Sequence, residues 1–347
     1  MSLVDWDTAS AVGRRLVPAG PTVDPGAAVE AIESLTAAAV ASVAPVRAAT
    51  GLIADPALDR TVVVDRPAWI DSNVTGMRVM TQSLADRADE QRDPTSFMAT
   101  AGGKASAAQL GAMLSWVATK VLGQYEAITP VGQPGRLLLV APNIVAAERQ
   151  LEVPEQDFRQ WVCLHEETHR VQFGATPWLK GHFQAEVDTF LAGVELSNGE
   201  ALKRLGAVSV AVVKVLRGAS GASIIDAAQT PSQRLVFERL TAFMSLLEGH
   251  ADYVMDAVGP AVIPSLDTIR SRFDARREQP GAADGLLRRL MGMDAKLRQY
   301  TDGRRFVTGV VERVGVEGFN RVWTSPQTLP TMAEIADPAQ WVERVVE

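Results

Sequence analysis

The sequence is poor in cysteine, histidine and aromatic residues. Its 347 residues include one cysteine, Cys163, and four histidines, and 6% of them are aromatic. One cysteine excludes an intrachain disulfide and a cysteine-rich structural zinc site, and it favours a reducing compartment. The few aromatic residues, set against abundant alanine and valine, are typical of closely packed helices.

The sequence also lacks an excess of positive charge and a long uninterrupted apolar run. The net charge of −7 argues against nucleic acid or an anionic membrane as a partner, because both need a basic protein face. Residues 1–16 lack the basic start and apolar core of a secretory signal. Polar residues interrupt 105–122, and 207–216 is too short to cross a membrane. We therefore expect a soluble cytoplasmic protein, and its oligomeric state is left open.

Apolar periodicity predicts a mainly α fold with a small β element. An apolar run between Pro134-Gly135 and Pro142-Asn143 predicts a strand at 136–141, and Thr61–Val64 is a weaker strand candidate. Apolar residues that recur every three or four positions, together with residues that favour the start of a helix, predict helices along much of the chain. These helices cover 25–46, 231–259, 263–277 and 284–300, and others begin at 67, after Gly102-Gly103 and at 155.

The helix expected from residue 155 carries the sequence HEETH at 165–169. Side chains four positions apart on a helix lie about 40° apart around its axis, so His165 and His169 can bind one ion at about 2.0–2.1 Å. Glu166 is turned by about 100° from His165 and can reach a water on that ion as a general base. This is the pattern of metalloproteases. The alternative is a helix that carries a partly exposed histidine pair. Cys163 faces elsewhere and is expected to be a small buried residue.

A catalytic zinc needs a third protein ligand, and four residues are candidates: His182, Glu186, Glu248 and His250. The metzincin continuation is excluded, because it requires glycine at position 172 and histidine at position 175. Glu248 is favoured, since it lies in an otherwise apolar helix where a carboxylate needs a partner.

The stretch SLLEGHAD (245–252) also places Asp252 four residues after Glu248. This resembles the Glu-x-x-x-Asp arrangement of gluzincins, which implies that Asp252 accepts a hydrogen bond from a ligand histidine. His250 is turned by about 200° from Glu248, so the two cannot easily share an ion, and a partly buried histidine bonded to a neighbour is expected. His182 follows an expected turn at 177–181 and is expected to be structural or to lie at the rim of the site.

Taken together, the segments HEETHRVQF, PWL, SLLEGHADYVMD, KLRQY, GRRFV, GFNRVW and LPT resemble a family of zincin-like metallopeptidases of actinobacteria, first described as a domain of unknown function. One branch of that family is labelled as associated with deazaflavin coenzyme biosynthesis. The resemblance implies a largely helical zincin-like fold, with His165, His169 and Glu248 as zinc ligands and Glu166 as the base. It supplies no substrate.

Zincins often stabilise the oxyanion with a tyrosine, histidine or arginine near the metal. Tyr300 is the candidate here, and its alternative is a half-buried packing residue. Asn320 and Arg321 are weaker candidates. Gln172, one turn beyond His169, is expected either to line the cleft or to lie on the helix surface.

These residues predict hydrolysis of a peptide or small amide by a zinc-activated water. Segment 136–141 is expected to be an edge strand along which an extended peptide pairs. Two alternatives stay open: an inactive zincin-like binding or scaffold protein, and a metal-dependent hydrolase of a small molecule linked to coenzyme biosynthesis. We expect residues 1–130 to form a helical scaffold and residues 131–347 the zincin-like catalytic part, together in one compact unit.

Overall fold

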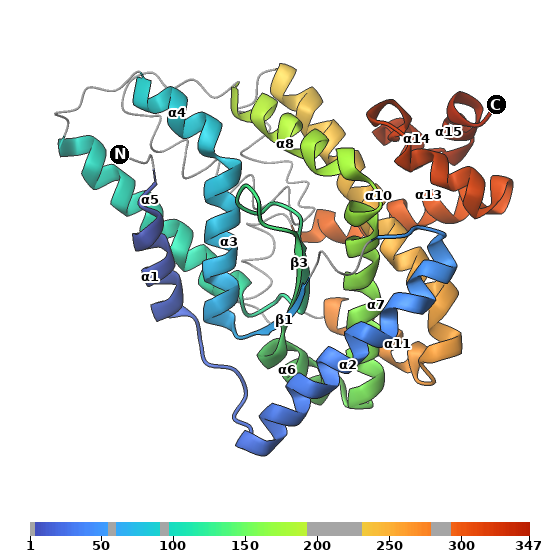
Figure 1. Cartoon of the computed structure of the whole chain (residues 1–347), viewed down its shortest axis with the longest axis horizontal. Helices are drawn as coiled ribbons and strands as arrows, with labels where there is room; N and C mark the ends of the chain where they lie inside the picture. Colours follow the sequence, from blue (N-terminus) through green and yellow to red (C-terminus); the bar gives the residue numbers. More distant parts are fainter. Residues whose placement is uncertain (1–3, 55–59, 91–96, 193–230, 279–292) are drawn as a thin grey trace.

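The computed structural model describes residues 4–54, 60–90, 97–192, 231–278 and 293–347, and helices dominate these ranges (Figure 1). The helices are α1 (Trp6–Leu16), α2 (Pro25–Thr50), α3 (Arg66–Met80), α4 (Gln82–Glu90), α5 (Phe97–Val117), α6 (Ala141–Leu151), α7 (Glu155–Gly174), α8 (Pro177–Ala192), α10 (Pro231–Val262), α11 (Leu266–Glu278), α13 (Met293–Phe319), α14 (Met332–Ala336) and α15 (Pro338–Val345), with the 3-10 turns η2 (Asn320–Trp323) and η3 (Pro326–Thr328). The strands are β1 (Arg60–Val64), β2 (Gly123–Glu126) and β3 (Arg136–Val140). The predicted mainly α class with a small β element is confirmed.

The three strands form one sheet in the order β1-β3-β2. β1 runs parallel to β3, and β2 runs antiparallel to it. Both predicted strands exist, but the prediction that 136–141 is an edge strand was wrong, because β3 is paired on both sides. Its continuous buried apolar run, Leu137–Val140, is typical of a central strand covered on both faces. β2 was missed because the sequence GQYE is short and largely polar.

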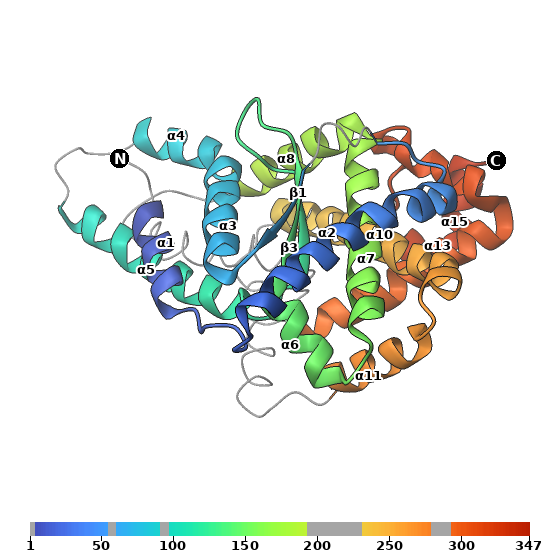
Figure 2. The same cartoon turned by 60° about the horizontal axis from the view of Figure 1, so that its bottom comes forward.

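The sheet lies between α3 on one face and α7 on the other (Figures 1 and 2). Successive side chains of a strand point to opposite faces, and β3 divides accordingly. Leu138 and Val140 join the hydrophobic cluster that contains Trp69 of α3. Leu137 and Leu139 join the other cluster, with Phe158 and Cys163 of α7. The sheet also joins strands from both sides of residue 130, so the two parts expected from the sequence share a core.

Cys163 is a buried free thiol, as expected, and burial raises its pKa. Its Sγ lies 3.7 Å from the backbone oxygen of Leu35 on α2. The cysteine therefore serves the packing of α7 against α2.

Several helix boundaries differ from the sequence prediction. α5 begins at Phe97, so Gly102-Gly103 lie inside the helix; the cost of about 1 kcal/mol for each glycine is small against tertiary packing. The expected turn at 177–181 is instead the start of α8, with Pro177 at a position where helices tolerate proline. α10 continues past the expected end at Gly259-Pro260 to Val262. The stretch 207–216 and the first part of 284–300 lie outside the described residues.

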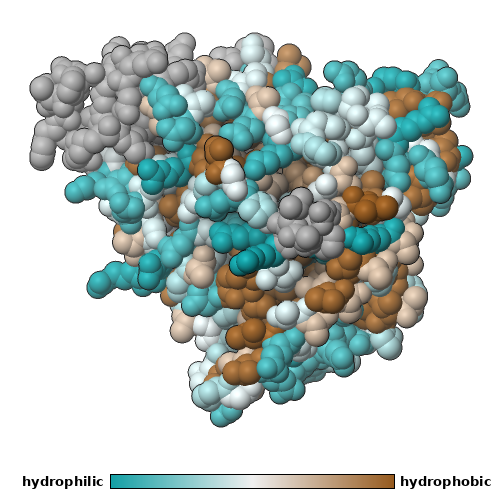
Figure 3. Space-filling view, in the orientation of Figure 1, coloured by the Kyte–Doolittle hydropathy of each residue, from teal (hydrophilic) through white to brown (hydrophobic). Residues whose placement is uncertain are grey.

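α2 is the one helix in the described ranges that is long and apolar enough to cross a membrane. It packs against α7 and buries Leu35 and Val46, as core helices of soluble domains also do. Its outer face is apolar as well, with Val29 and Val40 exposed, and Figure 3 shows apolar side chains gathered over this helix.

α10 and α13 meet through two glycines. A Cβ added to Gly249 would clash with the backbone of Gly303, and a Cβ added to Gly303 would clash with the carbonyl oxygen of Ser245. Both clashes are with backbone, which cannot move aside as a flexible side chain can. The two glycines therefore set how closely α13 approaches α10.

Replacing Gly249 with alanine should push the two helices apart and lower the free energy of unfolding by about 1–3 kcal/mol, the usual cost of overpacking a core. Gly181 of α8 is the matched control, because an added Cβ there meets nothing within 4 Å. Gly181→Ala should be neutral or raise stability by up to about 1 kcal/mol, since alanine is the better helix former. Chemical denaturation measures both variants, and equal stability of the two would contradict the glycine contact.

Candidate metal centre

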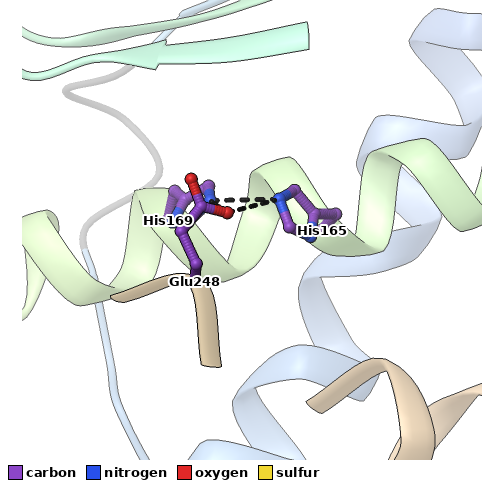
Figure 4. Close-up of side chains that lie close together, drawn as sticks. All are labelled: His165, His169 and Glu248. Carbon is purple, nitrogen blue, oxygen red and sulfur yellow. Dashed lines mark hydrogen bonds and ion pairs between the residues drawn. The ribbon is translucent and has the colours of Figure 1, made fainter. Parts of the chain in front are cut away.

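Three side chains from two helices converge on one point. His165 and His169 project from α7, and Glu248 faces them from α10 (Figure 4). The two Nε2 atoms are 3.2 Å apart, and Oε2 of Glu248 is 3.4 Å from His165 Nε2 and 3.7 Å from His169 Nε2. The structure thus brings together the three ligands predicted from the sequence.

The spacing of these atoms suits a tetrahedral metal ion. Two ligand atoms that each lie about 2.0–2.1 Å from such an ion are about 3.3 Å apart. The three observed separations fall around this value. Two imidazoles and one carboxylate are also a ligand set that zinc takes in catalytic sites, where a fourth position stays open. The residues therefore fit zinc in both geometry and chemistry.

The site stabilises positive charge. Burial by itself disfavours the protonated form of His169, but the hydrogen bond and charge of Glu248, with the charge of Glu166, outweigh it and raise the pKa to about 9. The side chains of His165, His169 and Glu248 are 19%, 14% and 11% exposed, so little solvent screens these charges. The electrostatic field that favours a proton at this point also favours a cation.

Glu166 is buried beside the cluster, against strand β2. A Cβ added to Gly123 would lie 2.6 Å from Cγ and 2.8 Å from Oε1 of Glu166. Glycine is thus the residue that leaves room for this carboxylate. Sequence reasoning missed Gly123 because it missed β2; an isolated glycine within a strand is the signal that marks a close approach.

The other three candidates for a third ligand have different partners. The ring of His182 packs between Trp178 and Phe243. Glu186 forms an ion pair with Arg239 at 2.8 Å. His250 is hydrogen-bonded to Gln172 and stacked on aromatic rings, and it lies outside the three-residue group.

The Nδ1 atoms of the two histidines face Met255 and Gln172. His165 Nδ1 is 3.3 Å from Met255 Sδ, and His169 Nδ1 is 2.9 Å from Oε1 of Gln172. Asp252 lies one turn beyond Glu248 and is half-buried. Its role as acceptor for a ligand histidine stays a prediction.

The remaining candidates lie elsewhere or have other contacts. Tyr300 belongs to α13, and its side chain is outside the described part of the structure. Asn320 donates to the backbone oxygen of Thr50, and Arg321 donates to those of Val345 and Val346. These hydrogen bonds tie η2, which directly follows α13, to neighbouring segments.

Gln172 and His250 are buried next to the three-residue group. Gln172 is fully buried, so it does not lie on the helix surface, and its amide sits between His169 and His250. His250 is 2% exposed and stacks on Phe319. Burial, with the nearby charge of His169, lowers the pKa of His250 to about 3, so its ring is neutral. The expectation of a buried histidine bonded to a neighbour is confirmed.

The chain resembles a solved structure and a known protein family. A crystal structure from Chloroflexus aurantiacus, described as a "putative hydrolase with a novel fold", superposes with a TM-score of 0.70 at 28% identity, covering 99% of each chain. No curated protein matches this sequence. The family of zincin-like metallopeptidases matches residues 4–342, nearly the whole chain, and the protein therefore belongs to that family.

Proposed function

We propose that this protein is a zinc-dependent metallopeptidase, with His165, His169 and Glu248 as the zinc ligands and Glu166 as the general base. The observation that carries the proposal is the convergence of two imidazole nitrogens and one carboxylate oxygen at separations of 3.2–3.7 Å. A purely structural zinc site is closed by four ligands and needs no such base. Membership of the zincin-like family supports the same reaction class.

A zinc ion held by His165, His169 and Glu248 would act as a Lewis acid, which would activate water and polarise a carbonyl group. Glu166 takes a proton from the attacking water as its oxygen bonds to the carbonyl carbon. The carbon–nitrogen bond then breaks, and Glu166 passes that proton to the leaving amine. Its buried position beside His169, against β2, holds the carboxylate ready for both transfers.

The substrate class we infer is an extended peptide. β2 is an edge strand of the sheet, and it is the strand that lies against Glu166. Peptides commonly add to such an edge through main-chain hydrogen bonds. We therefore assign the pairing role to β2 in place of β3.

We also place the protein in the cytoplasm. In that reducing compartment its single buried thiol, Cys163, stays reduced.

Metal content tests the ligand assignment. The full chain purified without added metal should carry about one zinc, and Glu248→Ala should lose it, because two histidines alone hold zinc weakly. Glu186→Ala is the matched control, since this carboxylate binds Arg239 and not the three-residue group. Inductively coupled plasma mass spectrometry gives the zinc content. Equal zinc in the two variants would refute Glu248 as a ligand.

Hydrolysis tests the role of Glu166. Glu166→Gln should retain zinc and lose about 10²–10⁴-fold in peptide hydrolysis, the usual contribution of a general base. Glu155→Gln, in the exposed first turn of the same helix, should leave the rate unchanged. Cleavage of a mixed peptide library, followed by mass spectrometry, measures both. Full activity of the Glu166 variant would overturn the mechanism, and a zinc-loaded wild type that cleaves no peptide would overturn the peptide substrate.

Gly123 tests the position of the base independently. Gly123→Ala should displace the Glu166 carboxylate and slow hydrolysis while the zinc content stays the same, because the three atoms nearest to the added methyl group all belong to Glu166. Gly76→Ala serves as the control, because its added Cβ would make an ordinary 3.5 Å contact with Ile128. Unchanged rates in the Gly123 variant would show that the carboxylate does not need this space.

A further inference from the structure

The side chain of Gln172 connects a proposed zinc ligand with a buried histidine that binds no metal. Gln172 is fully buried on α7, one turn beyond His169. Its Oε1 lies 2.9 Å from His169 Nδ1. Its Nε2 lies 2.9 Å from the backbone oxygen of Leu247 and 3.0 Å from His250 Nδ1. All three contacts have hydrogen-bond length.

The Leu247 carbonyl fixes the orientation of this amide. A carbonyl oxygen only accepts hydrogen bonds, so the Gln172 atom that faces it must be the NH₂ group. The amide oxygen therefore faces His169 and accepts a hydrogen bond. His169 Nδ1 must carry the hydrogen and donate it to that oxygen. The second N–H of Gln172 points to His250 Nδ1, which must accept it and leave its own hydrogen on Nε2.

This assignment leaves His169 Nε2 as the nitrogen with a free lone pair in the neutral ring. Nε2 is also the atom that faces His165 and Glu248. A hydrogen bond on the far nitrogen of a metal-binding histidine fixes both its tautomer and its ring orientation. Here the acceptor is an uncharged amide, so the bond adds no negative charge to the site.

His250 is in turn held by aromatic rings. Its ring centroid lies 5.2 Å from that of Phe319 and 5.3 Å from that of Trp323. These residues come from the end of α13 and from η2. The ring cannot rotate away without disturbing this stack, so its Nδ1 stays directed at Gln172.

We propose that Gln172 and His250 are positioning residues, which hold His169 in the Nδ1–H tautomer and aim its Nε2 at the metal. This inference rests on the proposed zinc site, and it assigns to a glutamine–histidine pair the task that a carboxylate performs in many zinc sites.

Zinc affinity tests the proposal. Gln172→Met keeps the size of the side chain and removes its hydrogen bonds; zinc should bind about 10–100-fold more weakly, the usual loss when such a partner is removed. Gln160→Met is the matched control on the same helix, because the Gln160 amide donates to Ser42 Oγ, away from the site. Competition with a chromophoric chelator gives both dissociation constants, and equal affinities would refute the positioning role. A wild-type chain that binds no zinc would refute the zinc site itself.

Histidine tautomers, measured in the wild type, supply a second readout that a purely structural role would not predict. In the zinc-loaded wild type labelled with ¹⁵N-histidine, His169 should carry its hydrogen on Nδ1 and His250 on Nε2. The loss of one ring signal in His250→Phe, which retains a stacking ring, assigns His250 among the four histidines. A hydrogen found on His250 Nδ1 would reverse the direction of the bond and overturn the proposal.

Discussion

Glu248 is a carboxylate in the apolar side of α10, and the site is organised around the need to balance its charge. Its neighbours Leu246 and Leu247 are buried, and Glu248 is buried with them. A buried carboxylate without a positive partner costs several kcal/mol. The histidine rings supply that partner, and the field that results is local: beside Glu248 the pKa of His169 rises to about 9, whereas burial lowers that of His250 to about 3. Positive charge is thus favoured at one point, where the two Nε2 atoms and the carboxylate meet.

The helices that carry these groups are held by contacts that do not involve the site. α7 fills the cluster beneath β3 with Phe158 and Val162, so it cannot turn about its axis without exposing them. α10 is fixed by the close approach of Gly249 to Gly303. Because both helices are fixed by packing, the two Nε2 atoms and the Glu248 carboxylate are held at their separations by the fold. Such preorganisation is what a tight and geometrically selective metal site requires.

The parts of the site that were predictable from the sequence are those set by a single helix. The HEETH spacing fixes how His165, Glu166 and His169 project, because helical geometry is local. Glu248 was predictable for a different reason, since an acidic residue in an apolar helix implies a buried partner.

The other parts depend on contacts between segments far apart in the chain. β2 has no apolar pattern of its own, and it exists as a strand only because β3 pairs with it. The residues of β3 do not show which strands pair with it, so the prediction of an edge strand was wrong. The sequence leaves Gln172 either lining the cleft or on the helix surface, and only the packing of α10 places Leu247 and His250 against it. In each case the missing information was tertiary packing.

The residues that hold the site in place extend much further along the chain than the site itself. The proposed ligands and base lie between 165 and 248, but the His250 ring, which faces the Gln172 amide, is stacked on Phe319 and Trp323. Trp178 of α8 donates to the backbone oxygen of Trp323, so a third helix meets this stack. A chain that kept HEETH and Glu248 but lost α13 and η2 would keep its ligands without the contacts that aim them. The family match likewise runs from residue 4 to residue 342 and includes these segments as well as the motif.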